Sequence, residues 1–291
     1  MNIISFSREE LKTMIYLCTA LYFEATPFIK TFQLKRNSNF TRFAVYNNDE
    51  IFLIVTGTGA NAAIGLTYFL STIAITPEDV LINVGVCGST NKDQSIGSPY
   101  LIHKIKDHST NLTYFPEMLY KHPFLESSIE SCPTIINTTQ IQTLTEPLID
   151  MEASYIYQAA SYFIKPHQLI IFKIISDHLE GQRISKEEIE KLISPHIIPL
   201  IEWVNMLSST ILVHNKIFSV EEIKLYEELV IKLRLSATMQ AKLKQLLLYA
   251  KNCNKPISSI MYEFQQSNDI VDLKVKSEGK RYFELLLSKL I

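Results

Sequence analysis

The sequence predicts an α/β protein, with a three-layer αβα domain around a mixed central sheet and a small all-helical C-terminal appendage. Short, nearly continuous apolar runs alternate with helical patterns in the first part of the chain, which favours a largely parallel sheet covered by helices on both faces. From Asn215 onward the strand pattern stops and apolar residues recur at helical spacing. We therefore predict two domains, residues 1–212 and residues 213–291.

The expected strands are apolar runs rich in Ile, Val, Tyr and Phe that are short and bounded by turn residues. These runs are Met14–Leu21, Phe40–Tyr46, Ile51–Thr56, Val80–Val84, Pro133–Asn137 and Leu169–Ser176. The expected helices of the same domain are Ala60–Thr72, Asp150–Ile164 and Ser185–Leu207. The last begins with the capping box Ser185-Lys186-Glu187-Glu188, in which Ser and Glu satisfy each other's backbone N–H groups.

The C-terminal appendage is predicted to contain three or four helices. A second capping box, Ser219-Val220-Glu221-Glu222, begins the first of them. The apolar stripe of this first helix starts at Ile223, and stripes that start at Leu243, Ile257 and Tyr282 define the others. Lys and Arg exceed Asp and Glu here, but they are spread among the acidic residues, so a solvated helical surface is favoured over a nucleic-acid site.

The composition is that of a globular protein of 291 residues, 47% hydrophobic, with a net charge of −2. This near-neutral charge argues against nucleic-acid binding by the whole chain. The N-terminus lacks a basic region followed by a long apolar core, and no apolar run reaches the roughly 18 residues of a membrane helix. We therefore expect no signal peptide, no membrane association and a cytoplasmic location.

The cysteines Cys18, Cys87, Cys132 and Cys253 are scattered, with no close pair and no histidine at ligand spacing. This pattern favours buried thiols in a reducing compartment over disulfides or a zinc site. We predict no metal ion and no organic cofactor.

Two short acidic stretches carry the chemical information of the chain. Asp150-Met151-Glu152-Ala153 opens an expected helix, and Ile174-Ile175-Ser176-Asp177 closes an expected strand. The helix and the strand after it form half of a βαβ unit, in which the first turn of a helix and the carboxyl end of a strand can line one crevice. Two carboxylates placed there can act on one small molecule in different ways.

Four segments in order then resemble the purine nucleoside phosphorylase and methylthioadenosine/S-adenosylhomocysteine nucleosidase superfamily, over about the first 190 residues. They are Ala20-Leu21-Tyr22-Phe23-Glu24-Ala25, the turn Val55-Thr56-Gly57-Thr58-Gly59-Ala60-Asn61-Ala62-Ala63, Ile82-Asn83-Val84-Gly85-Val86-Cys87-Gly88, and the Asp-Met-Glu-Ala and Ser-Asp pair. The resemblance implies a phosphorylase-like αβα fold, closer to the nucleosidases than to the phosphorylases.

Cleavage of an N-glycosidic bond requires protonation of the leaving base, support for an oxocarbenium-like sugar and an activated nucleophile. Asp177 ends an apolar strand, where burial favours its protonated form, and is the candidate acid for a purine N7. Glu152, which we expect the helix dipole to keep ionised, can accept hydrogen bonds from the ribose hydroxyls. Glu24 is the candidate base for the attacking water, and Met151 offers an apolar surface under the sugar.

The resemblance assigns these roles residue by residue to Glu24, Met151, Glu152 and Asp177. The remaining substrate-binding candidates are Ser176, Gly57, Gly85 and Val86. Simpler interpretations exist for single residues: Asp177 could cap the next element, Glu152 could stabilise a helix dipole, and Gly57 and Gly59 could only permit a tight turn.

Water is favoured over phosphate as the nucleophile. Phosphorylases of this superfamily bind a dianion with arginines and a hydroxyl group. Here the first loop carries Glu24 without an arginine, Asn83 stands where an arginine would be, and Val86 replaces the hydroxyl residue. Lys173 also stands where nucleosidases carry an arginine, which keeps the charge but loses the bidentate geometry.

We therefore expect hydrolysis of a purine nucleoside, of the adenine type with a modified 5′ group. The alternatives are a phosphate-dependent nucleoside phosphorylase and a non-catalytic nucleoside-binding or scaffold protein. The expected partner is the small-molecule nucleoside, and the resemblance further implies a homo-oligomer, a dimer or larger.

Overall fold

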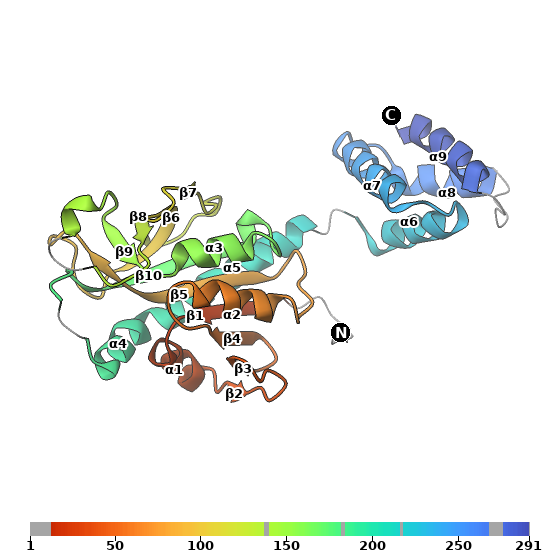
Figure 1. Cartoon of the computed structure of the whole chain (residues 1–291). Helices are drawn as coiled ribbons and strands as arrows, with labels where there is room; N and C mark the ends of the chain where they lie inside the picture. The colour runs from red at the N-terminus through yellow and green to blue at the C-terminus, as the bar shows by residue number, and fades with distance from the viewer. Residues whose placement is uncertain (1–12, 137–139, 182–183, 216–217, 268–275, 291) are drawn as a thin grey trace. The chain divides into compact units, whose positions relative to one another are not determined.

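The computed structural model describes residues 13–136, 140–181, 184–215, 218–267 and 276–290. The chain divides into two compact units, Met1–Ile211 and Leu212–Ile291. Figure 1 labels the helices and strands of both units.

A mixed sheet forms the centre of the first unit, with the strand order β10-β6-β8-β9-β5-β1-β4-β3-β2 and β7 beside β6. β1, β4, β5 and β10 are parallel to one another, whereas β3, β6 and β9 each include an antiparallel pairing. Because β10 also pairs with β5, the strands β5, β10, β6, β8 and β9 close into a ring. The strands are β1 (Ile15–Thr19), β2 (Lys35–Arg36), β3 (Ala44–Asn47), β4 (Ile51–Val55), β5 (Val80–Ser89), β6 (Pro99–Asp107), β7 (Thr113–Tyr114), β8 (Leu125–Ser131), β9 (Leu148–Asp150) and β10 (Leu169–Asp177).

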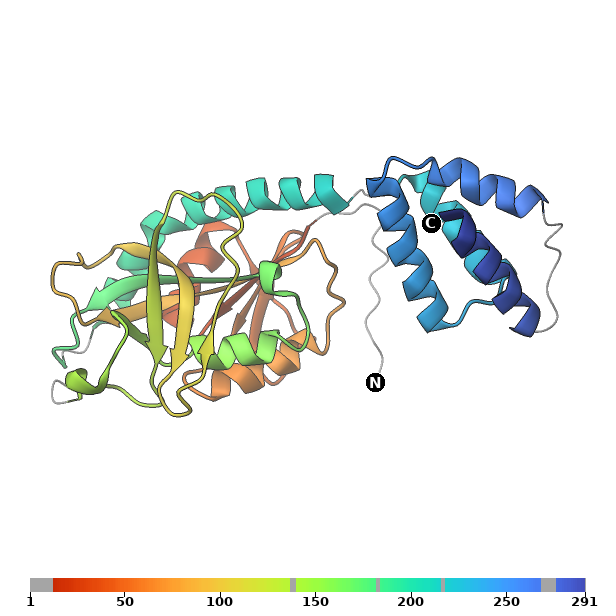
Figure 2. The ribbon, with the colours of Figure 1, turned by 90° about the horizontal axis from the view of Figure 1, so that it is seen from above.

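Helices cover both faces of this sheet, as Figure 2 shows from above. The helices of the unit are α1 (Tyr22–Thr31), α2 (Asn61–Leu70), α3 (Ala153–Ala160), α4 (Lys186–Ile193) and α5 (Ile197–Asn215), with the short 3₁₀ segments η1 (Ile141–Thr143), η2 (Pro166–Gln168) and η3 (Ser194–His196). Successive residues of a strand point to opposite faces. Accordingly, Ile15 and Leu17 belong to the core under α1, α4 and α5, whereas Tyr16 and Cys18 belong to the core under α2 and α3. The predicted three-layer αβα fold is confirmed.

Most of the predicted strands and helices of this unit are present, with two strands longer or shifted. Val80–Val84 extends to Ser89, and the run Phe40–Tyr46 forms a strand only at its end, in β3. The prediction of a strand at Pro133–Asn137 is wrong: residues 133–136 form bends and irregular structure, and Asn137 lies outside the described residues. The strand of this region is β8, which ends at Ser131.

Three helix boundaries also differ from the prediction. Asp150 does not open a helix: it ends β9, and α3 begins at Ala153 after a bend, with Glu152 as its N-cap residue. The segment Ser185–Leu207 is not one helix, because Ser194 and Pro195 form a 3₁₀ turn between α4 and α5. Proline cannot continue the hydrogen-bond ladder of the preceding helix. The helix α1, which begins shortly after β1, was not predicted from the sequence.

The second unit consists, in its described part, of α6 (Val220–Lys232), α7 (Ala237–Asn252), α8 (Ile257–Ser267) and α9 (Lys276–Leu290). Ser219 caps α6 as predicted, since its hydroxyl accepts from Glu222 N and Glu222 Oε2 accepts from Ser219 N. Leu229, Leu243, Phe264 and other apolar residues of the four helices form a separate core.

None of the helices in the described ranges is long and apolar enough to cross a membrane. The four cysteines are free thiols. Cys18, Cys87 and Cys132 are buried as predicted, but Cys253 is exposed.

Candidate active site

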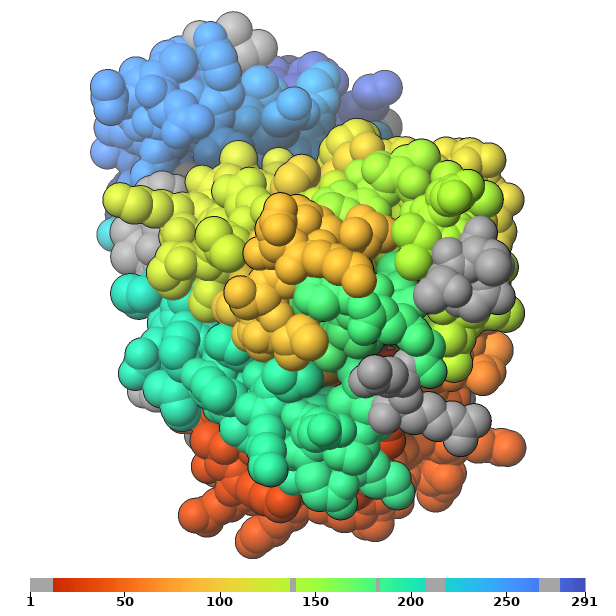
Figure 3. All heavy atoms as spheres, turned by 90° about the vertical axis from the view of Figure 1, so that its left-hand side faces the viewer, coloured from red at the N-terminus to blue at the C-terminus, as the bar shows by residue number. Residues whose placement is uncertain are grey.

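The predicted site residues lie at the edge of the sheet where the parallel strands β1, β4, β5 and β10 end. Figure 3 shows the molecule from this side, with the segment between β5 and β6 in amber next to the residues that follow β10 in green. An ion pair of 2.7 Å between Lys92 Nζ and Glu180 Oε1 joins these two segments. Ligands of open α/β sheets bind at such an edge.

Glu24 is held at this edge by backbone N–H groups. It lies in the first turn of α1 and is 3% exposed, so it is not a solvated loop carboxylate. Its Oε2 accepts from Ala20 N at 3.0 Å and Leu21 N at 2.9 Å, and its Oε1 accepts from Val86 N at 3.0 Å. Burial raises the pKa of Glu24 above its ordinary value, although the backbone donors and Lys173 oppose that shift.

Gly85 of β5 provides the space for this carboxylate. A Cβ atom at Gly85 would lie 2.8 Å from Glu24 Oε1, which is closer than real Cβ contacts. Gly85 pairs with Lys173 across β5 and β10. Paired residues of neighbouring strands have their side chains on the same face, so the Glu24 carboxylate lies beside the Lys173 side chain.

Lys173 is the buried cation of the site. Its side chain is 2% exposed, and its Nζ lies 2.8 Å from Asp150 Oδ2. Burial alone would lower the pKa of Lys173, but Asp150, Glu152 and Glu24 outweigh this effect and raise it. Lys173 is therefore charged at neutral pH in the folded protein.

Glu152 lies between the end of β9 and the start of α3. Its Oε1 accepts from Gly59 N at 3.0 Å, and this donor is available because Gly57 and Gly59 adopt positive φ angles of 88° and 60° in the turn before α2. Burial, then the nearby Asp150 charge, raise the pKa of Glu152 to about 7, while Lys173 and Gly59 lower it. The prediction that the helix dipole keeps Glu152 fully ionised is therefore wrong, because burial dominates.

Asp177 is the last residue of β10, and it pairs with Gly88 of the neighbouring strand β5. Its Oδ2 accepts from Ser176 Oγ at 2.7 Å, and its Oδ1 accepts from Leu179 N at 2.8 Å. Ser176 Oγ is also 3.1 Å from Cys87 O. Among the hydrogen bonds of the described residues, none joins Asp177 to Glu24 or Glu152. Gly88 follows Gly85 by three positions in the strand, a rise of roughly 10 Å, so the two ends of the site are spaced along β5.

The structure thus brings Glu24, Gly85 and Val86 into contact, and Gly59 with Glu152. Met151 is half-buried in the bend before α3. The sequence analysis missed Asp150 as the partner of Lys173. A lysine inside an otherwise apolar strand requires a buried anion, and Asp150, next to a predicted site residue, could have been proposed from that rule.

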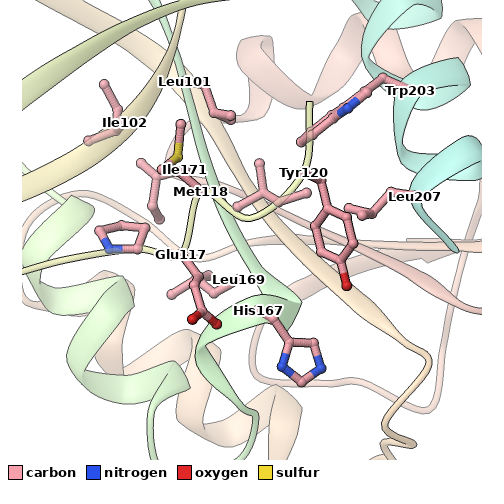
Figure 4. Close-up of a pocket in the computed structure, with 12 residues that line it drawn as sticks. Leu101, Ile102, Glu117, Met118, Tyr120, His167, Leu169, Ile171, Trp203 and Leu207 are labelled. Atoms are coloured by element: carbon pink, nitrogen blue, oxygen red, sulfur yellow. The ribbon is translucent and has the colours of Figure 1, made fainter. Parts of the chain in front are cut away.

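The described part of the chain also has cavities away from this edge, including a small one and a larger one. One of about 20 Å³, shown in Figure 4, is formed by β6, β10, α5 and the segment before β8, with Tyr120, His167 and Trp203 in its lining. It is large enough for about one water molecule. The other, of about 450 Å³, lies beside the start of β1 and is lined by Tyr16, Phe40 and Phe52. Neither contains a predicted site residue.

The comparisons with known proteins agree with this fold. The sequence profile of the Phosphorylase superfamily matches residues 2–142. No curated protein matches the sequence. The resemblance predicted from the sequence is confirmed by this match and by solved structures of nucleosidases with the same fold.

Three of these structures illustrate the similarity. The 5′-methylthioadenosine nucleosidase of Arabidopsis thaliana has a TM-score of 0.56 and 16% identity, with 67% of this chain and 97% of the plant chain covered. The 5′-methylthioadenosine/S-adenosylhomocysteine nucleosidase of Neisseria meningitidis, solved with methylthio-immucillin-A, has a TM-score of 0.55 and 16% identity. The match covers 68% of this chain and 99% of the bacterial chain. A futalosine hydrolase mutant of Helicobacter pylori has a TM-score of 0.52 and 12% identity. The match covers 65% of this chain and 99% of that chain. At these identities the likeness establishes the fold.

The close approach of Gly85 and Glu24 predicts a coupled effect of two substitutions. We expect Gly85→Ala to lower the free energy of unfolding by about 1–3 kcal/mol, because the added methyl group overlaps Glu24 Oε1. In a Glu24→Ala background the same substitution should cost less than about half as much. Denaturant unfolding followed by the fluorescence of Trp203, the single tryptophan, measures both values in the first unit. Equal costs in the two backgrounds would contradict the contact.

The raised pKa of Glu152 predicts that its carboxylate destabilises the fold at high pH. The stability associated with the protonated group is present below the unfolded pKa of about 4.5 and is lost as the pH rises through about 7. Glu152→Gln should therefore raise the free energy of unfolding by about 1–3 kcal/mol at pH 8. The same unfolding measurement at pH 4, below the unfolded pKa, should find almost no difference, and a difference independent of pH would exclude this cause.

Proposed function

We propose that the first unit is an N-ribosyl hydrolase that cleaves the N-glycosidic bond of a purine nucleoside and releases the base and the sugar. The observation that carries the proposal is the pair of buried carboxyl groups, Glu24 and Glu152, which both interact with the Lys173 ammonium and whose pKa values burial raises. Asp177, at the end of β10 and paired with Gly88 of β5, supplies a third carboxyl group farther along the same strand.

Glu24 has the geometry of a general base for water. A carboxylate offers about four lone-pair positions. Backbone N–H groups occupy two on Oε2 and one on Oε1, which leaves one position on Oε1 to accept from a water molecule. A raised pKa brings the basicity of the group closer to neutral pH, where general-base catalysis is most effective.

Glu152 is assigned to the ribose hydroxyls, with Met151 beneath the sugar. Gly59 N holds one oxygen of Glu152, so the other oxygen is available to a ligand. Asp177 is assigned to protonation of the purine N7. Ser176 and Leu179 N orient its carboxyl group by hydrogen bonds. Gly57, Gly85 and Val86 are assigned to the backbone around the sugar.

The charges of the site support water over phosphate. A phosphate dianion beside Lys173 would also meet Glu24, Glu152 and Asp150. The Lys173 ammonium is already paired with Asp150, and the Val86 amide is already used by Glu24. Like charges in a buried site oppose binding of a further anion.

For the substrate, we propose an adenine-type nucleoside with a modified 5′ group. The similar structures named above act on or bind methylthioadenosine, adenosylhomocysteine or futalosine according to their names, and this range supports the class rather than one compound. We also propose that the protein is a homo-oligomer and that residues 213–291 form a separate helical domain.

The reaction predicts base release without phosphate. The full chain, incubated with methylthioadenosine or adenosylhomocysteine in phosphate-free buffer, should release adenine as followed by chromatography. Glu24→Gln and Asp177→Asn should each lower kcat/KM at least ~100-fold, because each removes one proton-transfer group. Glu190→Gln, which changes a partly exposed carboxylate of α4 paired with Lys30, is the control and should leave the rate unchanged.

A strict requirement for phosphate would instead favour the phosphorylase. Binding of the nucleoside without release by the folded wild-type protein would favour the non-catalytic alternative.

The assignment of Glu152 predicts a pH dependence of substrate binding. The ionised carboxylate can accept hydroxyl hydrogen bonds at the oxygen that Gly59 N leaves free, and the protonated form predominates as the pH falls below about 7. KM for the ribonucleoside should therefore rise as the pH falls from 8 to 6, and this rise should be absent in Glu152→Gln. Initial rates over this pH range give both profiles, and a wild-type KM that does not change with pH would refute the assignment.

A further inference from the structure

We propose that Asp150 and Lys173 are positioning residues of the site, which orient the Glu152 side chain toward the ribose through the start of α3 and balance its charge. This inference rests on the proposed assignment of Glu152 to the ribose hydroxyls. Neither residue needs to touch the reacting atoms for this role.

Asp150 connects the cation directly to the helix start. One oxygen, Oδ2, lies 2.8 Å from Lys173 Nζ and accepts from Ala153 N at 2.8 Å. Ala153 is the first residue of α3, and its N–H is one of the donors that a helix leaves without a partner at its N-terminus. Glu152 lies between the two bonded positions, Asp150 and Ala153. The ion pair therefore fixes the backbone on both sides of Glu152.

The other oxygen of Asp150 is held by a buried chain of hydrogen bonds. Ser131 Oγ donates to Asp150 Oδ1 at 2.6 Å and accepts from Ser154 N at 2.9 Å. Ser154 Oγ in turn donates to Asp107 Oδ2 at 3.0 Å. These four residues are at most 5% exposed and come from β6, β8, β9 and α3. The position of Asp150 is thus set by three strands and one helix.

The free energy needed to bury the charges of Asp150 and Lys173 argues for a role beyond stability. A buried ion pair contributes little to stability compared with apolar residues of the same volume. Asp150 and Lys173 occupy positions at the ends or middle of otherwise apolar strands, where Ile or Leu would pack. Their electrostatic effects on Glu152 are opposite: the Asp150 charge raises the pKa of Glu152, and the Lys173 charge lowers it. The pair as a unit therefore places two opposing charges beside Glu152.

The first test compares two substrates that differ only in the groups that Glu152 is proposed to bind. In Asp150→Asn, KM for methylthioadenosine should rise at least ~10-fold with kcat lowered less than ~3-fold. For the 2′,3′-dideoxy counterpart of methylthioadenosine, KM should change less than ~3-fold, because this compound has no hydroxyl for Glu152. A loss that is equal for both compounds would overturn the positioning role.

The matched control is Glu146→Gln. Glu146 is a buried carboxylate of the same sheet region, and its pair with Lys104 is 2.6 Å long, but it does not contact the site residues. The same amide substitution there should leave the ratio of the two KM values as in the wild type. Lys173→Arg keeps the charge and should retain the wild-type ratio of the two KM values. The double variant Lys173→Met with Asp150→Asn removes both charges together, and its ratio should differ from that of the wild type.

The second test does not depend on turnover. Carboxyl groups are followed by ¹³C NMR in protein labelled at the glutamate side chains, and the Glu152 signal is identified by its loss in Glu152→Gln. The titration midpoint of Glu152 should move to lower pH in Asp150→Asn and to higher pH in Lys173→Met. If Lys173→Met does not fold, the difference between the Glu152 midpoints of the wild type and Asp150→Asn tests the inference, because the midpoint should fall to lower pH in this variant.

These two tests separate the inference from the proposed function. Absence of base release by the wild-type protein would reject the proposed function, while opposite shifts of the Glu152 midpoint would still support the balancing role of the pair. Base release by the wild type, with no midpoint shift in Asp150→Asn, would reject the inference and leave the proposed function standing.

Discussion

The structure of the candidate site depends on one buried charge. The Lys173 ammonium lies inside the sheet, and a cation there is stable only with anions close by. Asp150 provides the direct pair, and Glu24 and Glu152 complete the surroundings. Three carboxyl groups around one cation leave a surplus of negative charge. This surplus and burial explain why protons are held more tightly by Glu24 and Glu152 than in water.

The sheet brings these groups together from distant parts of the sequence. β5 is the common element: Gly85 makes room for Glu24, Val86 N binds it, and Gly88 lies beside Asp177. The pairing of Gly85 with Lys173 fixes the cation at the same level as Glu24. A shift of the register by one residue would turn Lys173 to the opposite face and leave the carboxylates without their counter-charge.

The sequence could predict the parallel core, because β4 and β10 are buried on both faces and consist of nearly continuous apolar residues. It could not reveal β6 and β8 in the same way. Their charged residues are satisfied across the strands, as in the pair of Lys106 and Glu130, so hydropathy alone does not identify them as strands. The candidate site residues were accessible through local motifs. Their protonation was not, since the effect of burial on Glu152 and the pairing of Lys173 with Asp150 depend on the tertiary structure.

A crystal structure with a C-nucleoside, whose base and ribose are joined by a bond that cannot be hydrolysed, tests the central claim most directly. The account predicts that the ribose hydroxyls contact Glu152, that the purine edge faces Asp177, and that a water molecule bound to Glu24 Oε1 lies beneath the sugar. A nucleoside bound away from β5, or with its sugar turned from Glu152 and Glu24, would contradict the account.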